Sequence, residues 1–257
     1  MSSLLKAQSS PESGSLARMP TVHMFIWHVA RKHVLRAGSH MAFDPLYFRK
    51  DSKVRFARAL GTGSGRTFTI SDADSQQWAT LVALHESCDD AAIDSLTPIR
   101  QWRALSDAHL HLRLRPIASR GSWGGQEPFA CSQQSNSALS GEIPDTTAIA
   151  AITRARVKAR YWRRFNREVP PVSTDLHANP GLIAAIGIGE YPVGLQGTFS
   201  LWRDAASLNE FAYKARPHAR AIDLTHSLQW YAEEMFTRFA VLDCTGSLNG
   251  VNPLQSS

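Results

Sequence analysis

The stretch Gly187-Ile-Gly-Glu190, followed by Thr198-Phe-Ser-Leu-Trp202 and closed by Phe239-Ala-Val-Leu-Asp243, decides the fold that we expect. The aromatic and aliphatic residues of the last two segments predict strands, and residues 204–213 between them have the pattern of a helix. The order is therefore glycine-containing turn, strand, helix and strand.

The first half of the chain carries a faint copy of this order. Gly61-Thr-Gly-Ser-Gly65 precedes a strand pattern at Trp78-Ala-Thr-Leu-Val-Ala-Leu84, and a helical stretch and another strand follow. In that strand, His109-Leu-His-Leu-Arg-Leu-Arg115 alternates, which places the leucines on one face and the polar residues on the other. A repeat of this length predicts two similar units packed together.

The remaining elements of the first half are less regular. Val22–Val29 predicts a strand, residues 30–42 predict a helix that Pro45 closes, and Val54–Leu60 predicts a second strand. Pro98 divides the helical stretch 89–105 into two short helices, because proline disrupts a helix interior.

The second half restarts with a buried strand at Thr146–Thr153. A helix is expected over Arg156–Glu168, where Val157, Tyr161 and Phe165 form an apolar stripe among basic residues. Each half then has the order β-α-β-β-α-β of a ferredoxin-like unit.

The expected fold class is α+β, with two fused ferredoxin-like halves forming a sandwich like a dimeric α+β barrel. One chain here supplies both halves. The expected boundaries are a disordered tail at 1–19, an N-terminal half at 20–126, a linker at 127–144, a C-terminal half at 145–250 and a tail at 251–257.

Composition bounds the function. The chain has 257 residues, of which 43% are hydrophobic, so it can build a core and global disorder is excluded. Its net charge of +6 suits an acidic protein partner, nucleic acid or an anionic membrane surface. Because motifs for stacking bases on aromatic residues are lacking, nucleic acid is not expected.

Cysteine usage and hydropathy bear on location. The three cysteines show no CxxC spacing, which is typical of a reducing cytoplasm. No apolar run approaches the roughly 18 residues that span a bilayer. We therefore expect a cytoplasmic protein with at most peripheral contact with the inner membrane.

Histidine is the first candidate for a site. His218 follows Pro217 at the start of a short helical pattern, and imidazole is a common axial ligand of haem iron. An ordinary surface or core histidine is the alternative. His85 and His177 are weaker candidates, and a metal held by the strand neighbours His109 and His111 lacks a third ligand.

Other motifs carry less chemistry. The glycine stretch 61–65 is not followed by the helix start that a phosphate loop needs, so a flexible loop beside a pocket is expected. Gly-x-Ser-x-Gly is absent, which leaves no nucleophile elbow. Cys244, a conceivable thiolate ligand, is better explained as an inert thiol.

The chain resembles the spheroidene monooxygenase family of carotenoid biosynthesis. Seven segments in the family's order carry the resemblance. They are Leu60-Gly-Thr-Gly-Ser-Gly65 with Phe68-Thr69, Gly121-Ser-Trp-Gly-Gly-Gln-Glu-Pro-Phe129, Ala150-Ala-Ile-Thr-Arg-Ala-Arg156, Ile186-Gly-Ile-Gly-Glu190, Phe199-Ser-Leu-Trp-Arg-Asp204, Pro217-His-Ala-Arg-Ala-Ile222 and Arg238-Phe-Ala-Val-Leu-Asp243.

The resemblance implies a haem-dependent monooxygenase. Such an enzyme would use O₂ and reduced ferredoxin to oxygenate the end of an acyclic carotenoid, giving a hydroxy and then a keto product. It is also similar to aldoxime dehydratases, haem enzymes of the same barrel type in which a histidine holds the iron. On this basis His218 is the expected metal ligand, and Arg154 is expected to pair with a haem propionate.

The chain departs from the family at His85-Glu-Ser87, where a Trp-Pro-Asp turn is usual, and at 72–77. A different apolar substrate therefore stays open. So do a haem enzyme of dehydratase or peroxidase type, a non-catalytic binder of haem or an apolar metabolite, and a cofactor-free monooxygenase on the same barrel. For the expected enzyme, the basic helix 156–168 would dock the acidic ferredoxin.

Overall fold

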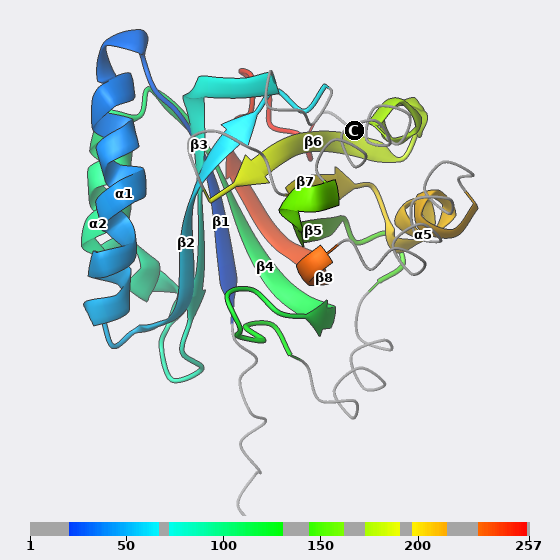
Figure 1. Cartoon of the computed structure of the whole chain (residues 1–257), viewed down its shortest axis with the longest axis horizontal. Coiled ribbons are helices and arrows are strands. Elements are labelled where there is room, and N and C mark those ends of the chain that lie inside the picture. The colour runs from blue at the N-terminus through cyan, green and yellow to red at the C-terminus, as the bar shows by residue number, and fades with distance from the viewer. Residues whose placement is uncertain are drawn as a thin grey trace, which may run out of the picture.

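Eight strands close into one barrel in the computed structural model, which describes residues 21–66, 72–130, 144–161, 173–190, 197–214 and 231–255 (Figure 1). Every neighbouring pair of strands is antiparallel. The strands are β1 (Val22–His28), β2 (Val54–Gly63), β3 (Ala73–Leu84), β4 (Ala108–Gly121), β5 (Ile149–Val157), β6 (Leu182–Gly189), β7 (Gly197–Trp202) and β8 (Tyr231–Gly246).

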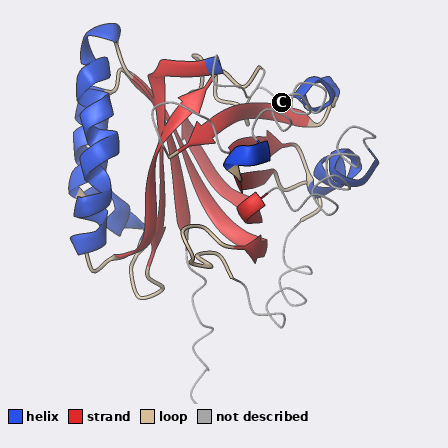
Figure 2. Cartoon of the chain, viewed as in Figure 1, coloured by secondary structure: helices blue, strands red, loops and turns tan. Residues whose placement is uncertain are grey.

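Helices lie outside the barrel wall, as Figure 2 shows. Short helices η1 (Arg31–His33) and η3 (Asp90–Ser95) precede α1 (Val34–Lys50) and α2 (Thr97–Leu105), and these two long helices cover the outer face of the first sheet. In the second half lie η4 (Ala159–Tyr161), a helix at 173–178 and α5 (Ala205–Lys214).

The two halves repeat one topology. The first sheet has the order β4-β1-β3-β2 and the second has the order β8-β5-β7-β6, each from a β-α-β-β-α-β unit. The expected fold class is thereby confirmed. Within one chain, the two ferredoxin-like sheets share a common interior.

The two seams that join the halves differ in length. β4 pairs with β8 over eleven residue pairs, from Leu110↔Gly246 to Gly121↔Met235. β2 pairs with β6 over only three pairs, from Gly61↔Gly189 to Gly63↔Gly187. The β2–β6 seam is therefore the weaker closure, and the first part of β6 runs beyond it.

The barrel interior is the main core. Period-2 alternation directs Leu110, Leu112 and Leu114 of β4 inward, as the sequence predicts. Trp123 and Phe129, which follow β4, also pack in this core. Phe129 lies two residues inside the expected linker, so the start of that segment belongs to the barrel packing.

Several predicted elements need correction. Pro45 does not end the first helix: α1 continues to Lys50, because Asp44 accepts hydrogen bonds from His40 (3.0 Å) and from the Trp102 indole (2.7 Å), and Phe48 is buried beyond. These contacts offset the hydrogen bond that proline cannot donate. Pro98 does separate η3 from α2, as predicted.

Strand ends are also longer than predicted. The glycine stretch continues β2 through Gly63, so its first three residues are strand rather than loop. Arg156 and Val157 lie in β5, where a helix was expected. The reason is the ladder: both residues pair with β8, and Val157 lies opposite Tyr231. Residues 162–168 of that expected helix lie outside the described residues.

Among the helices that the structure describes, none combines the length and the apolar character needed to cross a bilayer.

A buried histidine, His23, and a half-buried one, His111, lie together on the outer face of the first sheet. His23 Nδ1 lies 3.0 Å from His111 Nε2, and the Phe25 ring stacks on His111 at 4.0 Å between centroids. Burial lowers the pKa of His23 to about 4. Burial and the neighbouring His23 lower the pKa of His111 to about 3. Both rings are therefore neutral at pH 7.

This burial predicts an acid sensitivity. In the unfolded chain a histidine pKa is near 6.5, so below that pH the unfolded state takes up a proton that folded His23 does not. Stability conferred by neutral His23 is complete above about pH 6.5 and falls as the pH drops toward 4. Between pH 7 and pH 4.5 the free energy of unfolding should fall in both proteins. We expect the fall to be about 2 kcal/mol smaller in His23→Phe than in the parent, measured by urea unfolding.

The neighbouring Phe25→Leu is the matched control, because it perturbs the same cluster without removing a titrating group. It should lower stability equally at both pH values. A His23→Phe protein with the parent's full acid loss would show that this pair does not titrate on unfolding.

Candidate functional site

A buried cluster of charges lies at the barrel end where β5 and β6 finish. It consists of Arg58, Trp123, Arg154, Glu190 and Glu233, and we call it the Arg154 cluster. The Arg154 side chain is only 4% exposed; its Nη1 lies 2.7 Å from Glu233 Oε2 and its Nη2 lies 2.9 Å from Glu190 Oε1. Arg58 Nε approaches Glu190 at 3.9 Å. Two cations and two carboxylates thus balance, with Arg154 and Glu233 shielded from solvent and Arg58 and Glu190 partly exposed.

Trp123 joins this cluster to the core. Its indole N–H donates to Glu190, and the guanidinium carbons of Arg154 and Arg58 lie 5.1 Å and 5.6 Å from its ring centroid. Both distances suit a cation–π contact. The ring therefore binds the charges on one side and the apolar interior on the other.

The turn after β4 is shaped to hold Glu233. Gly121 has φ +82°, and a Cβ there would stand 2.1 Å from the Glu234 carbonyl oxygen, so only glycine fits. Beyond it, Ser122 Oγ and the Gly125 N–H donate to Glu233 Oε1 at 3.0 Å and 2.8 Å. Burial alone would raise the pKa of Glu233, but these donors and Arg154 outweigh it and lower the pKa to about 2.

Three of the seven segments that carry the family resemblance meet in this cluster. Trp123, Arg154 and Glu190 come from three separate stretches of the chain. The sequence pointed to Arg154 but not to its carboxylate partners, because no local spacing links positions 154, 190 and 233. Glu190 does close the quoted Gly-Ile-Gly-Glu segment, which is the one signal available.

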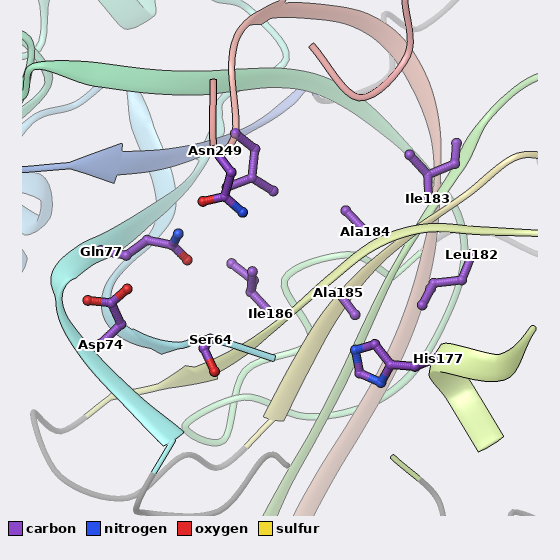
Figure 3. Close-up of a pocket in the computed structure, with 11 residues that line it drawn as sticks. Ser64, Asp74, Gln77, His177, Leu182, Ile183, Ala184, Ala185, Ile186 and Asn249 are labelled. Atoms are coloured by element: carbon purple, nitrogen blue, oxygen red, sulfur yellow. The ribbon is translucent and has the colours of Figure 1, made fainter. Parts of the chain in front are cut away.

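A pocket of about 410 Å³ lies at the short β2–β6 seam, and we call it the seam pocket. Figure 3 shows Ser64, Asp74 and Gln77 on one side, His177 on the other, and the side chains of β6 between them. Residues 182–186 of β6 and Leu248 and Asn249 complete the lining. Its volume lies toward the lower end of the range for small-molecule sites.

The outer faces of the two sheets carry side chains of different size. In the first half, β1 and β3 present large side chains to the helices: Phe25, Trp27, Trp78 and Val82. In the second half, strand alternation points small side chains outward along β5, β6 and β7: Ala151, Thr153, Ala155, Ala185, Thr198 and Ser200. We call this second surface the small-residue face.

The small-residue face is covered at one end only. Along β5 and β7 only Ile149 and Trp202, at that end, are large, and there Leu176, Leu208 and Phe211 pack in one cluster with Ile149, Ala151 and Trp202. The first outer face is filled by tryptophans stacked with Trp102 of α2. Ala185 and Leu182 belong both to the outer face of the second half and to the seam pocket, so the two features adjoin.

The predicted ligands stand as follows. His218 lies outside the described residues. Arg154 lies within β5 rather than after it, and its guanidinium is paired with two carboxylates. A propionate contact, which stays a prediction, would require it to release one of them.

The other candidates are placed. His177 lines the seam pocket, and its Nδ1 lies 2.8 Å from the Ser173 carbonyl oxygen. His109 and His111 share the outer face of β4, but within the described ranges no group of three or more metal-ligating side chains gathers. Burial, reinforced by the Asp243 carboxylate, raises the pKa of Cys244 to about 11, so its thiol is protonated at neutral pH.

Sequence comparison gives a consistent answer. No protein-family model matches the chain. Among curated proteins, it is 34% identical over 219 residues to the spheroidene monooxygenase of Rhodobacter capsulatus, covering 85% of this chain and 88% of that protein. It is 32% identical to the spheroidene monooxygenase of Cereibacter sphaeroides, over 79% of this chain and 60% of that protein. The Rubrivivax gelatinosus protein of the same name is 30% identical over 76% of this chain and 72% of its own length.

Solved structures agree on the fold. An aldoxime dehydratase in complex with butyraldoxime superposes with a TM-score of 0.59 at 10% identity, covering 94% of this chain and 87% of that one. A second aldoxime dehydratase superposes with a TM-score of 0.58 at 10% identity, covering 98% of this chain and 94% of that one. At such low identity the likeness concerns the architecture alone.

The Arg154 cluster predicts strong energetic coupling. Arg154→Met leaves the largely buried Glu233 and the partly exposed Glu190 without their shared cation and should lower the free energy of unfolding by about 3 kcal/mol, measured by urea denaturation at pH 7. Glu233→Gln should also destabilise the protein. The loss of stability in the double variant should be well below the sum of the losses in the two single variants, because the two residues act on one interaction.

An exposed ion pair supplies the control. Asp94 bonds Arg103 at 2.6 Å in solvent, and Asp94→Asn should change stability by less than about 1 kcal/mol. In acid the parent should lose Glu233's contribution as the pH falls from about 4.5 toward 2, a loss that Glu233→Gln lacks. Additive effects of Arg154→Met and Glu233→Gln would show that the cluster does not act as one unit.

Proposed function

Because the chain belongs to the spheroidene monooxygenase family, and is on that basis a monooxygenase, we propose that it is haem-dependent and oxygenates the end of an acyclic carotenoid with O₂ and reduced ferredoxin. The observation that carries this proposal is the identity of 34% over 85% of the chain. The meeting of three family segments in the Arg154 cluster supports it, since separate stretches of sequence serve one place in the barrel.

The reaction balances with these partners. One hydroxylation takes a C–H bond, O₂, two electrons and two protons to an alcohol and water. A second hydroxylation at the same carbon gives a geminal diol, which loses water to become a ketone. Two one-electron transfers from ferredoxin supply the electrons of each cycle.

The cofactor would lie against the small-residue face. Haem iron, when bound, supplies the activation of dioxygen. His218 would hold the iron, and the short side chains Thr153 and Thr198 would leave room for a flat macrocycle beyond the end of the face that Leu176, Leu208 and Phe211 cover. The Arg154 cluster would hold the end of β5 and β6 rigid from the inner side of the same sheet.

The seam pocket would receive the substrate end. It adjoins the small-residue face through Ala185, and its apolar wall of β6 residues suits an isoprenoid terminus. Its volume holds an end group rather than a whole polyene, so most of the carotenoid molecule would stay outside the pocket. Oxygenation at the terminus of the carotenoid follows from that arrangement.

The haem assignment is tested by absorption spectroscopy. We expect the purified protein to show a haem band that His218→Ala abolishes or shifts, because the axial nitrogen is lost. His85→Ala, at an exposed histidine after β3, should leave the band unchanged. Thr153→Phe, which gives the exposed part of the small-residue face a side chain of the kind that β1 carries, should reduce haem retention.

An unchanged band in His218→Ala would move the ligand to another residue. A colourless parent protein would favour a cofactor-free monooxygenase instead.

The reaction is tested by product analysis. Incubation with an acyclic carotenoid, O₂ and reduced ferredoxin should give hydroxylated and then keto products, with one oxygen atom from ¹⁸O₂. Raising the ionic strength should slow turnover, because ferredoxin docking by charge is screened by salt. Conversion of an aldoxime to a nitrile, without carotenoid oxidation, would favour a dehydratase, and binding without turnover would favour a carrier.

A further inference from the structure

The outer face of α1 presents large apolar side chains to solvent. Leu35 is 90% exposed, and Phe43, Tyr47 and Leu46 are 58%, 54% and 49% exposed. The opposite face of the same helix is already used, because Met41 and Phe48 pack against the first sheet. α1 is therefore apolar on two sides, although only one is covered.

These four residues form one surface. Their spacing of i, i+8, i+11 and i+12 gathers them on one side of a helix. The helix stands at the outer edge of the molecule, with α2 behind it (Figure 1). Large apolar side chains gathered on one exposed surface mark a contact site, so this surface calls for an apolar environment.

Basic residues frame the same surface at both ends. Arg31, Lys32 and Arg36 stand at its beginning, and Arg49 and Lys50 stand at its end, all of them exposed. In the part of the chain that the structure describes, none of the five forms an ion pair. The carboxylate of α1, Asp44, is buried and bonded to His40 and Trp102. The surface is thus cationic as well as apolar.

We propose that this surface, the outer face of η1 and α1, binds an anionic lipid bilayer. Leu35, Phe43 and Leu46 would enter the boundary between headgroups and acyl chains, while the flanking lysines and arginines meet lipid phosphates. The helix lies in the plane of the interface and does not span it. The inference rests on the proposed function in one respect: an acyclic carotenoid dissolves in lipid, so an enzyme that acts on it would meet its substrate at a membrane.

Other occupants fit less well. Two copies packed through this face would set five cations against five cations, which is repulsive. An acidic protein would match the charges but would not accommodate four large apolar side chains that project from one convex helix. A bilayer supplies both anionic headgroups and an apolar interior.

One end of the surface contacts the strand that lines the candidate site. Arg31 Nε donates to Gln76 Oε1 at 3.3 Å, and the Val29 N–H donates to the Gln76 carbonyl at 2.8 Å. The next residue, Gln77, lines the seam pocket. The η1 end of this surface and the seam pocket thus contact the same strand, β3, from its two faces.

The test is flotation of the full-length purified protein with phosphatidylcholine vesicles containing 30% phosphatidylglycerol, or none. We expect binding to the anionic vesicles at low salt, and weaker binding to pure phosphatidylcholine and at high salt. The triple variant Leu35→Ser/Phe43→Ser/Leu46→Ser should lower the partition coefficient at least about tenfold. Arg36→Glu/Lys50→Glu should lower it about tenfold at low salt.

Matched controls distinguish binding through this surface from non-specific hydrophobic adsorption to the vesicles. Leu242→Ser and Val251→Ser remove exposed apolar side chains elsewhere and should leave vesicle binding unchanged. The α1 variants should keep the parent's unfolding midpoint and its turnover of detergent-solubilised carotenoid, so a failed flotation test and a failed oxygenase assay remain distinguishable.

Three outcomes would overturn the proposal. One is equal flotation of the triple variant and the parent. Another is a dimer, seen by sedimentation, that the triple variant dissociates, which would assign the face to a second copy. The third is loss of ferredoxin-dependent turnover in detergent in Arg36→Glu/Lys50→Glu with flotation unchanged, which would assign the face to the acidic electron donor.

Discussion

The antiparallel ladder between β4 and β8 is the constraint on which the rest of the structure depends. Its eleven residue pairs satisfy the edges of two sheets that would otherwise end in unpaired backbone groups. Once this seam is closed, the inner faces of both halves share one core. The opposite seam, between β2 and β6, has only three pairs, and the seam pocket opens where its ladder ends. The unequal seams thus place a cavity where the two halves meet.

The two halves have one topology but different chemistry. In the first half, aromatic residues on β1 and β3 fill the space under α1 and α2, and that face is structural. In the second half, β5 and β7 carry small residues outward, and the inner side of the same strands ends in the Arg154 cluster. One unit stabilises the barrel with large side chains, while the other carries small side chains on its outer face beyond the cluster of Leu176, Leu208 and Phe211. This division is the physical basis for assigning the proposed cofactor to the second half.

Prediction from sequence succeeded where local periodicity decides the outcome. Alternating leucines on β4 are buried as predicted, and Pro98 separates two short helices because proline acts on its own helix. It failed at Pro45, because contacts from Trp102, more than fifty residues away, hold the helix together there. It also failed at Arg156 and Val157, where pairing with β8 prevails over an amphipathic pattern. In each failure a partner distant in sequence overrode the local signal.

The sequence by itself determined the repeated β-α-β-β-α-β order and the family, since these depend on patterns written along the chain. Only the tertiary structure decided that Arg154 faces inward to Glu190 and Glu233, and that the apolar residues of α1 point away from the core. The physical reason is that burial and ion pairing depend on which strands become neighbours. Strand pairing sets those neighbours: β5 lies beside β8, which brings Arg154 to Glu233, 79 positions further along the chain.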